Sequence, residues 1–145
     1  MSYIGCCGDD CELCPRYIAS QNNDEAKLIE AAILWKKVGL REQIVSPDEM
    51  ICFGCLSLAH CHYDNIRECA RDKGISNCGK CMEYPCDSIK EVFNRTDHYA
   101  RQCEKMCDPK DYRCLQKAFF SKKEKLDSIH LEYIADEKKR MIKAV

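Results

Sequence analysis

Several features that define common protein classes are missing from this sequence. No stretch approaches the run of about 18 apolar residues that a membrane-spanning helix needs, and residues 1–15 hold no apolar core of a secretion signal. There is also no internal repeat of fixed period, no low-complexity run and no convincing alternation of apolar and polar residues. We therefore expect a cytoplasmic protein that has no membrane partner and little or no β structure.

An excess of charge of one sign is missing as well. The 23 basic and 24 acidic residues leave a formal net charge of −1, so no global field favours nucleic acid. Lysine clusters at 122–125 and 138–140 are interleaved with acidic residues, which is typical of a solvated helix face. A nucleic-acid partner is not expected.

Cysteine, by contrast, is abundant, with 14 residues in a chain of 145. A reducing cytoplasm opposes a disulfide framework, so metal ligation is the interpretation we favour. Three C-x-x-C pairs strengthen it, because two intervening residues let both sulfurs reach one ion. Gly54 and Gly79 lie inside two of these pairs and are expected to allow a positive-φ turn. The pairs are Cys11/Cys14, Cys52/Cys55 and Cys78/Cys81.

Spacing suggests two four-thiolate sites and therefore about two zinc ions per chain. One site joins a local group, Cys69, Cys78, Cys81 and Cys86. The other joins two distant pairs, Cys11, Cys14, Cys52 and Cys55. Cys7 and Cys61 remain; either could replace one of the eight, or the pair could bind metal with His60 or His62.

Iron–sulfur or thiol redox chemistry is the alternative, because spacing alone does not separate iron–sulfur ligands from zinc ligands. Cys7, Cys11 and Cys14 have the spacing of a radical-SAM cluster motif, but the barrel of such enzymes needs at least about 200 residues. A free Cys7 could instead act as a reactive thiol. Cys103, Cys107 and Cys114 could build a third site with Cys6 or His98, although core packing explains them more simply. No catalytic constellation stands out, so an enzymatic role is not favoured.

The fold class predicted is mainly α: a small irregular metal-stabilised domain, residues 1–95, with short helices around zinc knuckles, and a C-terminal helical segment, residues 96–145, packed on it. Start and stop signals place the helices. They are expected after Pro15, from Asn23 or Asp24 to Val38, after Ser46 in a capping box, from an Asp64 cap to Gly74, from Cys86 to about Phe93, and from Tyr99 onward with a break at Asp108-Pro109. In the last segment a single apolar stripe joins Leu115, Phe119, Leu126, Ile129, Tyr133 and Met141.

Two stretches carry a resemblance to a known family. The runs Cys7-Gly8-Asp9-Asp10-Cys11-Glu12-Leu13-Cys14-Pro15-Arg16-Tyr17 and Asn77-Cys78-Gly79-Lys80-Cys81-Met82-Glu83-Tyr84-Pro85-Cys86 are similar to the DUF3795 family, over about residues 4–93. The resemblance implies a cysteine-rich, zinc-binding bacterial or archaeal protein without an established activity. Many relatives have a further cysteine where this chain has Asp64, which argues against Cys61 as a ligand. We therefore expect a zinc-stabilised module that binds a protein partner.

Overall fold

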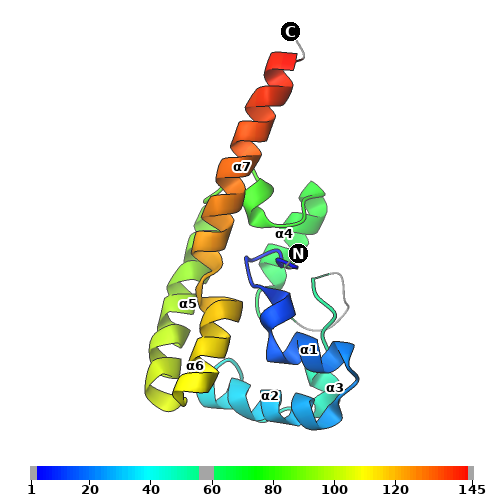
Figure 1. Ribbon diagram of the computed structural model, residues 1–145, viewed down its shortest axis with the longest axis vertical. Helices are drawn as coiled ribbons and strands as arrows, with labels where there is room; N and C mark the ends of the chain where they lie inside the picture. Colours follow the sequence, from blue (N-terminus) through cyan, green and yellow to red (C-terminus); the bar gives the residue numbers. More distant parts are fainter. Residues whose placement is uncertain (1–2, 56–60, 144–145) are drawn as a thin grey trace.

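The computed structural model describes residues 3–55 and 61–143, and most of these residues are helical (Figure 1). Within the two ranges the only β pairing is one antiparallel bridge between Ile4 and Asp10. The mainly α fold class predicted from the sequence is confirmed. None of the described helices combines the length and the apolar character needed to cross a bilayer.

The first half of the chain forms short helices at the expected signals. They are η1 (Cys11–Leu13), α1 (Pro15–Gln21), α2 (Glu25–Val38) and α3 (Pro47–Met50). The Asp24 side chain accepts from the Lys27 N–H and caps α2, which ends at Gly39 in a left-handed conformation. The predicted capping box of α3 is wrong, because the Ser46 side chain makes no cap hydrogen bond.

The middle of the chain forms α4 (Asp64–Lys73), η2 (Cys78–Lys80) and α5 (Asp87–Met106). Asp64 does not cap α4 as expected; its carboxylate accepts from the Cys61 N–H at 3.1 Å and pairs with Arg67 at 2.9 Å. The helix expected to end near Phe93 continues through Tyr99 to Met106, and α5 is 20 residues long in all. No glycine or proline interrupts it, and the Thr96 hydroxyl bonds to the Val92 carbonyl at 2.7 Å. The predicted domain division at residue 95 falls inside α5 and stays a prediction.

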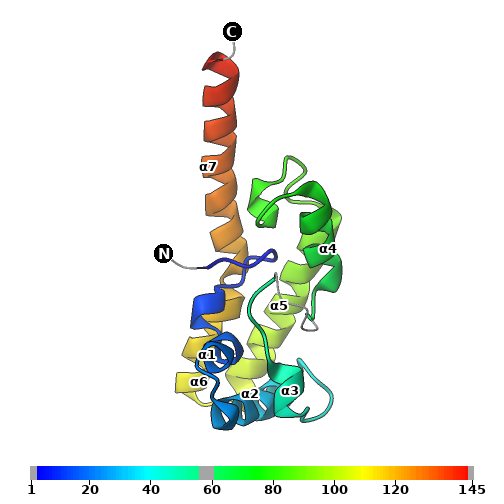
Figure 2. The ribbon, with the colours of Figure 1, turned by 90° about the vertical axis from the view of Figure 1, so that its right-hand side faces the viewer.

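The last part forms α6 (Pro109–Leu115), η3 (Gln116–Phe120) and α7 (Lys122–Lys143). The break at Asp108-Pro109 is confirmed, and the Asp108 carboxylate caps α6 by accepting from the Asp111 N–H. Of the predicted apolar stripe, Leu115 in α6 and Leu126 near the start of α7 are buried. The distal half of α7 extends beyond the rest of the molecule, and Met141 there is 70% exposed (Figure 2).

Two buried clusters hold these elements together. The first surrounds α2, which crosses the end of the molecule opposite the tip of α7 (Figure 1), and it includes Trp35, Val38, Met50 and Leu115. The second lies between α4, α5 and the start of α7, and Cys6 and Cys7 belong to it. Five further cysteines pack against the second cluster: Cys55, Cys61, Cys78, Cys81 and Cys86. Half of the 14 cysteines therefore belong to this second core or pack against it.

Candidate metal centre

A tight N-terminal loop carries the first cysteines into the protein. The Gly5 N–H donates to the Asp9 carbonyl at 2.8 Å, and the Cys11 N–H donates to the Tyr3 carbonyl at 2.9 Å. The Asp10 N–H donates to the Ala118 carbonyl at 2.8 Å, which fixes the loop against η3. The loop therefore presents Cys6 and Cys7 to the interior and leads directly into η1.

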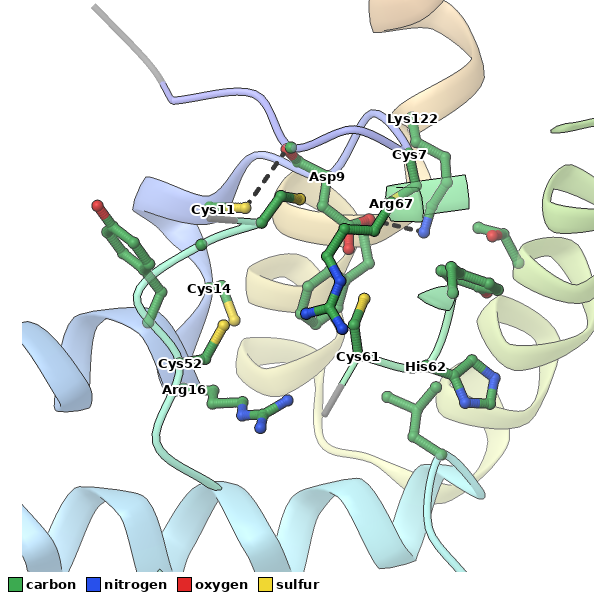
Figure 3. Close-up of a pocket in the computed structure, with 18 of the residues that line it drawn as sticks. Cys7, Asp9, Cys11, Cys14, Arg16, Cys52, Cys61, His62, Arg67 and Lys122 are labelled. Carbon is green, nitrogen blue, oxygen red and sulfur yellow. Dashed lines mark hydrogen bonds and ion pairs between the residues drawn. The ribbon is translucent and has the colours of Figure 1, made fainter. Parts of the chain in front are cut away.

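Cys11, Cys14, Cys52 and Cys55 converge on one cavity, as the pairing of C-x-x-C motifs predicts. The cavity measures about 110 Å³, and these thiols line it. A Cβ placed on Gly5 would lie 3.1 Å from Cys11 Sγ and 3.3 Å from Cys55 Sγ, so both sulfurs approach the same point. In Figure 3 the Cys14 and Cys52 sulfurs point toward each other. Segments about 40 residues apart in sequence thus contribute to one thiol group, centre A.

Burial disfavours the thiolate forms of Cys11 and Cys14 in centre A when no metal is bound. Desolvation, reinforced by Asp9 and the neighbouring cysteines, raises the pKa of Cys11 far above its usual value. Burial also raises the pKa of Cys14 to about 12. A bound cation removes this penalty, because metals coordinate thiolates and displace their protons.

Cys7 and Cys61 line the same cavity, which brings six thiols to its wall. Cys7 is buried beside the Asp9–Lys122 ion pair, and burial raises the pKa of its thiol well above the usual value. Within residues 3–55 and 61–143, no three Cys, His, Asp or Glu side chains are close enough together to hold an ion. This finding covers both centres, and the thiols of centre A lie around the wall of the cavity.

Among the charged side chains of the wall, cations outnumber carboxylates. Lys122, Arg16, Arg41 and Arg67 line the cavity, against one carboxylate, Asp9. Burial lowers the pKa of Arg41, and the nearby positive charge of Arg16 lowers it further. Such a wall suits a negatively charged occupant, and a four-thiolate metal site carries net negative charge.

The local cysteine group forms a second cluster, centre B. Burial, together with the nearby thiols Cys86, Cys69 and Cys81, raises the pKa of Cys78 to about 12. These four cysteines are the local group that the spacing predicts, and their joint ligation of one ion stays a prediction. Cys86 is the N-cap residue of α5, where the helix dipole favours a thiolate. The Lys73 ammonium donates to Cys81 Sγ at 3.2 Å. Centre B lies nearer the surface than centre A, with Cys69 exposed.

The two knuckle glycines behave differently. Gly54 has φ +92, so the predicted positive-φ turn is confirmed there. The same prediction for Gly79 is wrong, because its φ is not positive. A Cβ on Gly79 would lie 2.8 Å from Ile129 Cγ2, and glycine is needed there for the close approach of α7.

Sequence reasoning missed Cys6, which lies between the two centres. Its N–H donates to Cys55 Sγ at 3.2 Å, and its carbonyl accepts from the Cys78 N–H at 3.0 Å. A hydrogen bond with the Cys55 thiol lowers the pKa of Cys6. The adjacent Cys6-Cys7 pair was the only signal, because the contacts themselves depend on tertiary folding.

Histidine ligation is less well supported by the geometry. His62 Nε2 lies 2.9 Å from the Tyr99 hydroxyl, so this nitrogen already has a partner. His60 lies outside the described residues. Cys103 packs in the first core cluster and Cys6 in the second, and the structure does not bring them together.

The sequence profile described as "Protein of unknown function (DUF3795)" matches residues 3–91 of the chain. The match spans more than half of the chain and contains both centres, so the protein belongs to the DUF3795 family. No curated protein and no solved structure matches this sequence.

Proposed function

We propose that this protein binds two zinc ions, one at centre A and one at centre B, and that the metal stabilises the fold. The convergence of Cys11, Cys14, Cys52 and Cys55 on one cavity supports the proposal most strongly. Eight thiols without disulfides form a soft ligand set that suits zinc. The Cys6 N–H directed at Cys55 Sγ is the kind of backbone support that metal thiolates receive. A reducing cytoplasm is the compartment proposed, since it keeps these thiols free.

The cellular role we propose is that of an adaptor which binds a protein partner. The support comes from α7, whose distal half projects from the body and exposes Leu131, Met141 and Ile142. An amphipathic helix can dock its apolar side chains into a partner's groove. The metal centres then serve to hold the base of this helix in place.

Metal content of the purified protein tests the zinc proposal. Native mass spectrometry and elemental analysis are expected to give two zinc ions per chain and to leave six of the 14 cysteines as free thiols. Removing the metal with a chelator should reduce the helical far-UV signal and the melting temperature. Unchanged spectra after chelation would contradict a structural role for zinc.

Single alanine substitutions test the grouping. Cys14→Ala should remove the ion of centre A alone, and Cys69→Ala the ion of centre B alone. Cys114→Ala is the control, because Cys114 lies on α6 and belongs to neither proposed ligand set, and it should retain both ions. Two ions in Cys69→Ala would show that centre B is wrongly assigned.

An iron–sulfur cluster at centre A is the second candidate, and one observation favours it. Six thiols surround a cavity of about 110 Å³. A cluster of several iron and sulfide atoms fills more space than one ion. Iron with equimolar acid-labile sulfide in anaerobically purified protein would favour the cluster and a redox function over zinc.

A further inference from the structure

Three cysteines lie outside both centres and outside the family match at residues 3–91. Cys103 is in the last turn of α5, Cys107 is the residue at which that helix ends, and Cys114 is on α6. Cys103 and Cys107 belong to the first core cluster around α2, with Cys103 fully buried and Cys107 packed at its edge. Neither centre A nor centre B accounts for this pair.

The backbone holds Cys103 and Cys107 one helical turn apart. The Cys107 N–H donates to the Cys103 carbonyl at 2.9 Å. One such turn separates Cα atoms by about 6 Å, which is inside the range spanned by disulfides. The two side chains also influence each other, because the Cys107 thiol raises the pKa of Cys103. The two sulfurs are therefore neighbours before any oxidation takes place.

Solvent reaches the two thiols unequally. Cys103 has no exposed surface, whereas Cys107 is partly exposed. A small oxidant dissolved in water can therefore attack Cys107 first, and Cys103 is placed behind it. This arrangement of an accessible thiol and a buried neighbour is the one that resolves an oxidised cysteine into a disulfide.

We propose that Cys103 and Cys107 are a reversible redox pair that peroxide converts into a disulfide. Hydrogen peroxide oxidises the Cys107 thiol to a sulfenic acid and is itself reduced to water. Cys103 Sγ then attacks Cys107 Sγ, which forms the S–S bond and releases the sulfenic oxygen as a second water. A dithiol reductant returns two electrons and two protons and regenerates both thiols.

The environment of Cys103 sets the expected pH dependence of the second step. Burial, together with the Cys107 side chain, raises the pKa of its thiol to about 12. The thiolate is the attacking form, so the rate of disulfide formation should rise with pH across the neutral range. The rate of sulfenic acid formation at Cys107 is measured separately by trapping with dimedone.

Trypsin separates the candidate cysteines and makes the test direct. Cleavage after Arg101, Lys105, Lys110, Arg113 and Lys117 places Cys103 in peptide 102–105, Cys107 in peptide 106–110 and Cys114 in peptide 114–117. The metal-loaded protein is treated with hydrogen peroxide, alkylated, digested and analysed by mass spectrometry. We expect peptides 102–105 and 106–110 to become joined, with two hydrogens lost, and to separate again after dithiothreitol.

Variants distinguish this pair from general thiol damage. Cys103→Ala should leave a dimedone-reactive sulfenic acid on Cys107, and Cys107→Ser should leave peptide 102–105 reduced. Cys114→Ser is the matched control and should form the disulfide normally. Zinc content and zinc release are measured in the same samples. A failure of the zinc proposal can therefore be distinguished from a failure of the Cys103–Cys107 proposal. The proposal is overturned if peptides 102–105 and 106–110 stay reduced while other thiols are oxidised. It is also overturned if Cys107 becomes linked to the Cys114 peptide.

Discussion

Gly79 contacts α7 so closely that no side chain fits between them. A Cβ at this position would lie 2.8 Å from Ile129 Cγ2 and 3.0 Å from Asn77 Oδ1. We predict that Gly79→Ala destabilises the metal-loaded protein by about 1–3 kcal/mol, the usual cost of an overpacked contact. Urea unfolding at constant metal concentration measures the change.

Gly74 is a useful comparison with Gly79, because its backbone conformation and not a close contact favours glycine there. Its φ is +67 and nothing lies within 4 Å of an added Cβ, so Gly74→Ala strains only the backbone, at about 1 kcal/mol. The Ile129→Ala change should relieve Gly79→Ala in a double-mutant cycle and leave the effect of Gly74→Ala unaltered. If the destabilisations by Gly79→Ala and Ile129→Ala are strictly additive, the contact between these residues is not the cause of the Gly79→Ala destabilisation.

At the scale of elements, α3 depends on a side chain from α1. A helix of four residues has no stability of its own. Arg16, which is buried, donates to the Met50 carbonyl through Nε and to the Glu49 carbonyl through Nη2 at 3.0 Å. The end of α3 leads directly to Cys52, so Arg16 connects this helix to centre A.

We predict that Arg16→Lys destabilises the protein by about 2–4 kcal/mol, since a lysine cannot reproduce the forked donor geometry and leaves buried carbonyls unsatisfied. Zinc at centre A should also exchange faster with a competing chelator, because Cys52 is held less firmly. Arg95→Lys is the control, as Arg95 is half exposed in an α5 ion pair with Glu91, and it should change neither property. If zinc exchange is unaltered in Arg16→Lys, the position of α3 does not affect metal binding at centre A.

Elements with local signals were the ones that sequence could predict. The Asp24 cap, the Gly39 stop and the Pro109 break each depend on residues within a few positions, and all are confirmed. Ser46 has a matching pattern but makes no side-chain cap. The contact from Arg16 to the other end of α3 comes from a distant part of the chain and has no local signal. The same division applies to the thiols. C-x-x-C spacing predicts the groupings, whereas the contacts of Cys6 depend on long-range folding.

At the scale of the whole molecule, the last helix is fixed to the first loop. Lys122, at the start of α7, is 3% exposed and pairs with Asp9 at 2.7 Å. Its ammonium also lies 5.2 Å from the centre of the Tyr63 ring and 5.8 Å from that of Phe119. Burial alone would lower the pKa of Lys122, but Asp9, Cys7 and Tyr63 together outweigh burial and the pKa is raised. Lys122 therefore stays charged, and its ion pair closes one wall of the cavity.

Replacing Lys122 tests whether this pair joins the two ends of the chain. We predict that Lys122→Met destabilises the protein by about 3–5 kcal/mol, because it leaves the Asp9 carboxylate largely buried without its cation. The adjacent Lys123 pairs with Asp127 on the surface and is 61% exposed, so Lys123→Met should leave the unfolding midpoint unchanged. Combining Lys122→Met with Asp9→Asn removes the unpaired charge and should recover much of the loss. If the double variant is as unstable as Lys122→Met alone, the cost comes from packing against Tyr63 and Phe119, and the ion pair contributes little to holding α7 on the N-terminal loop.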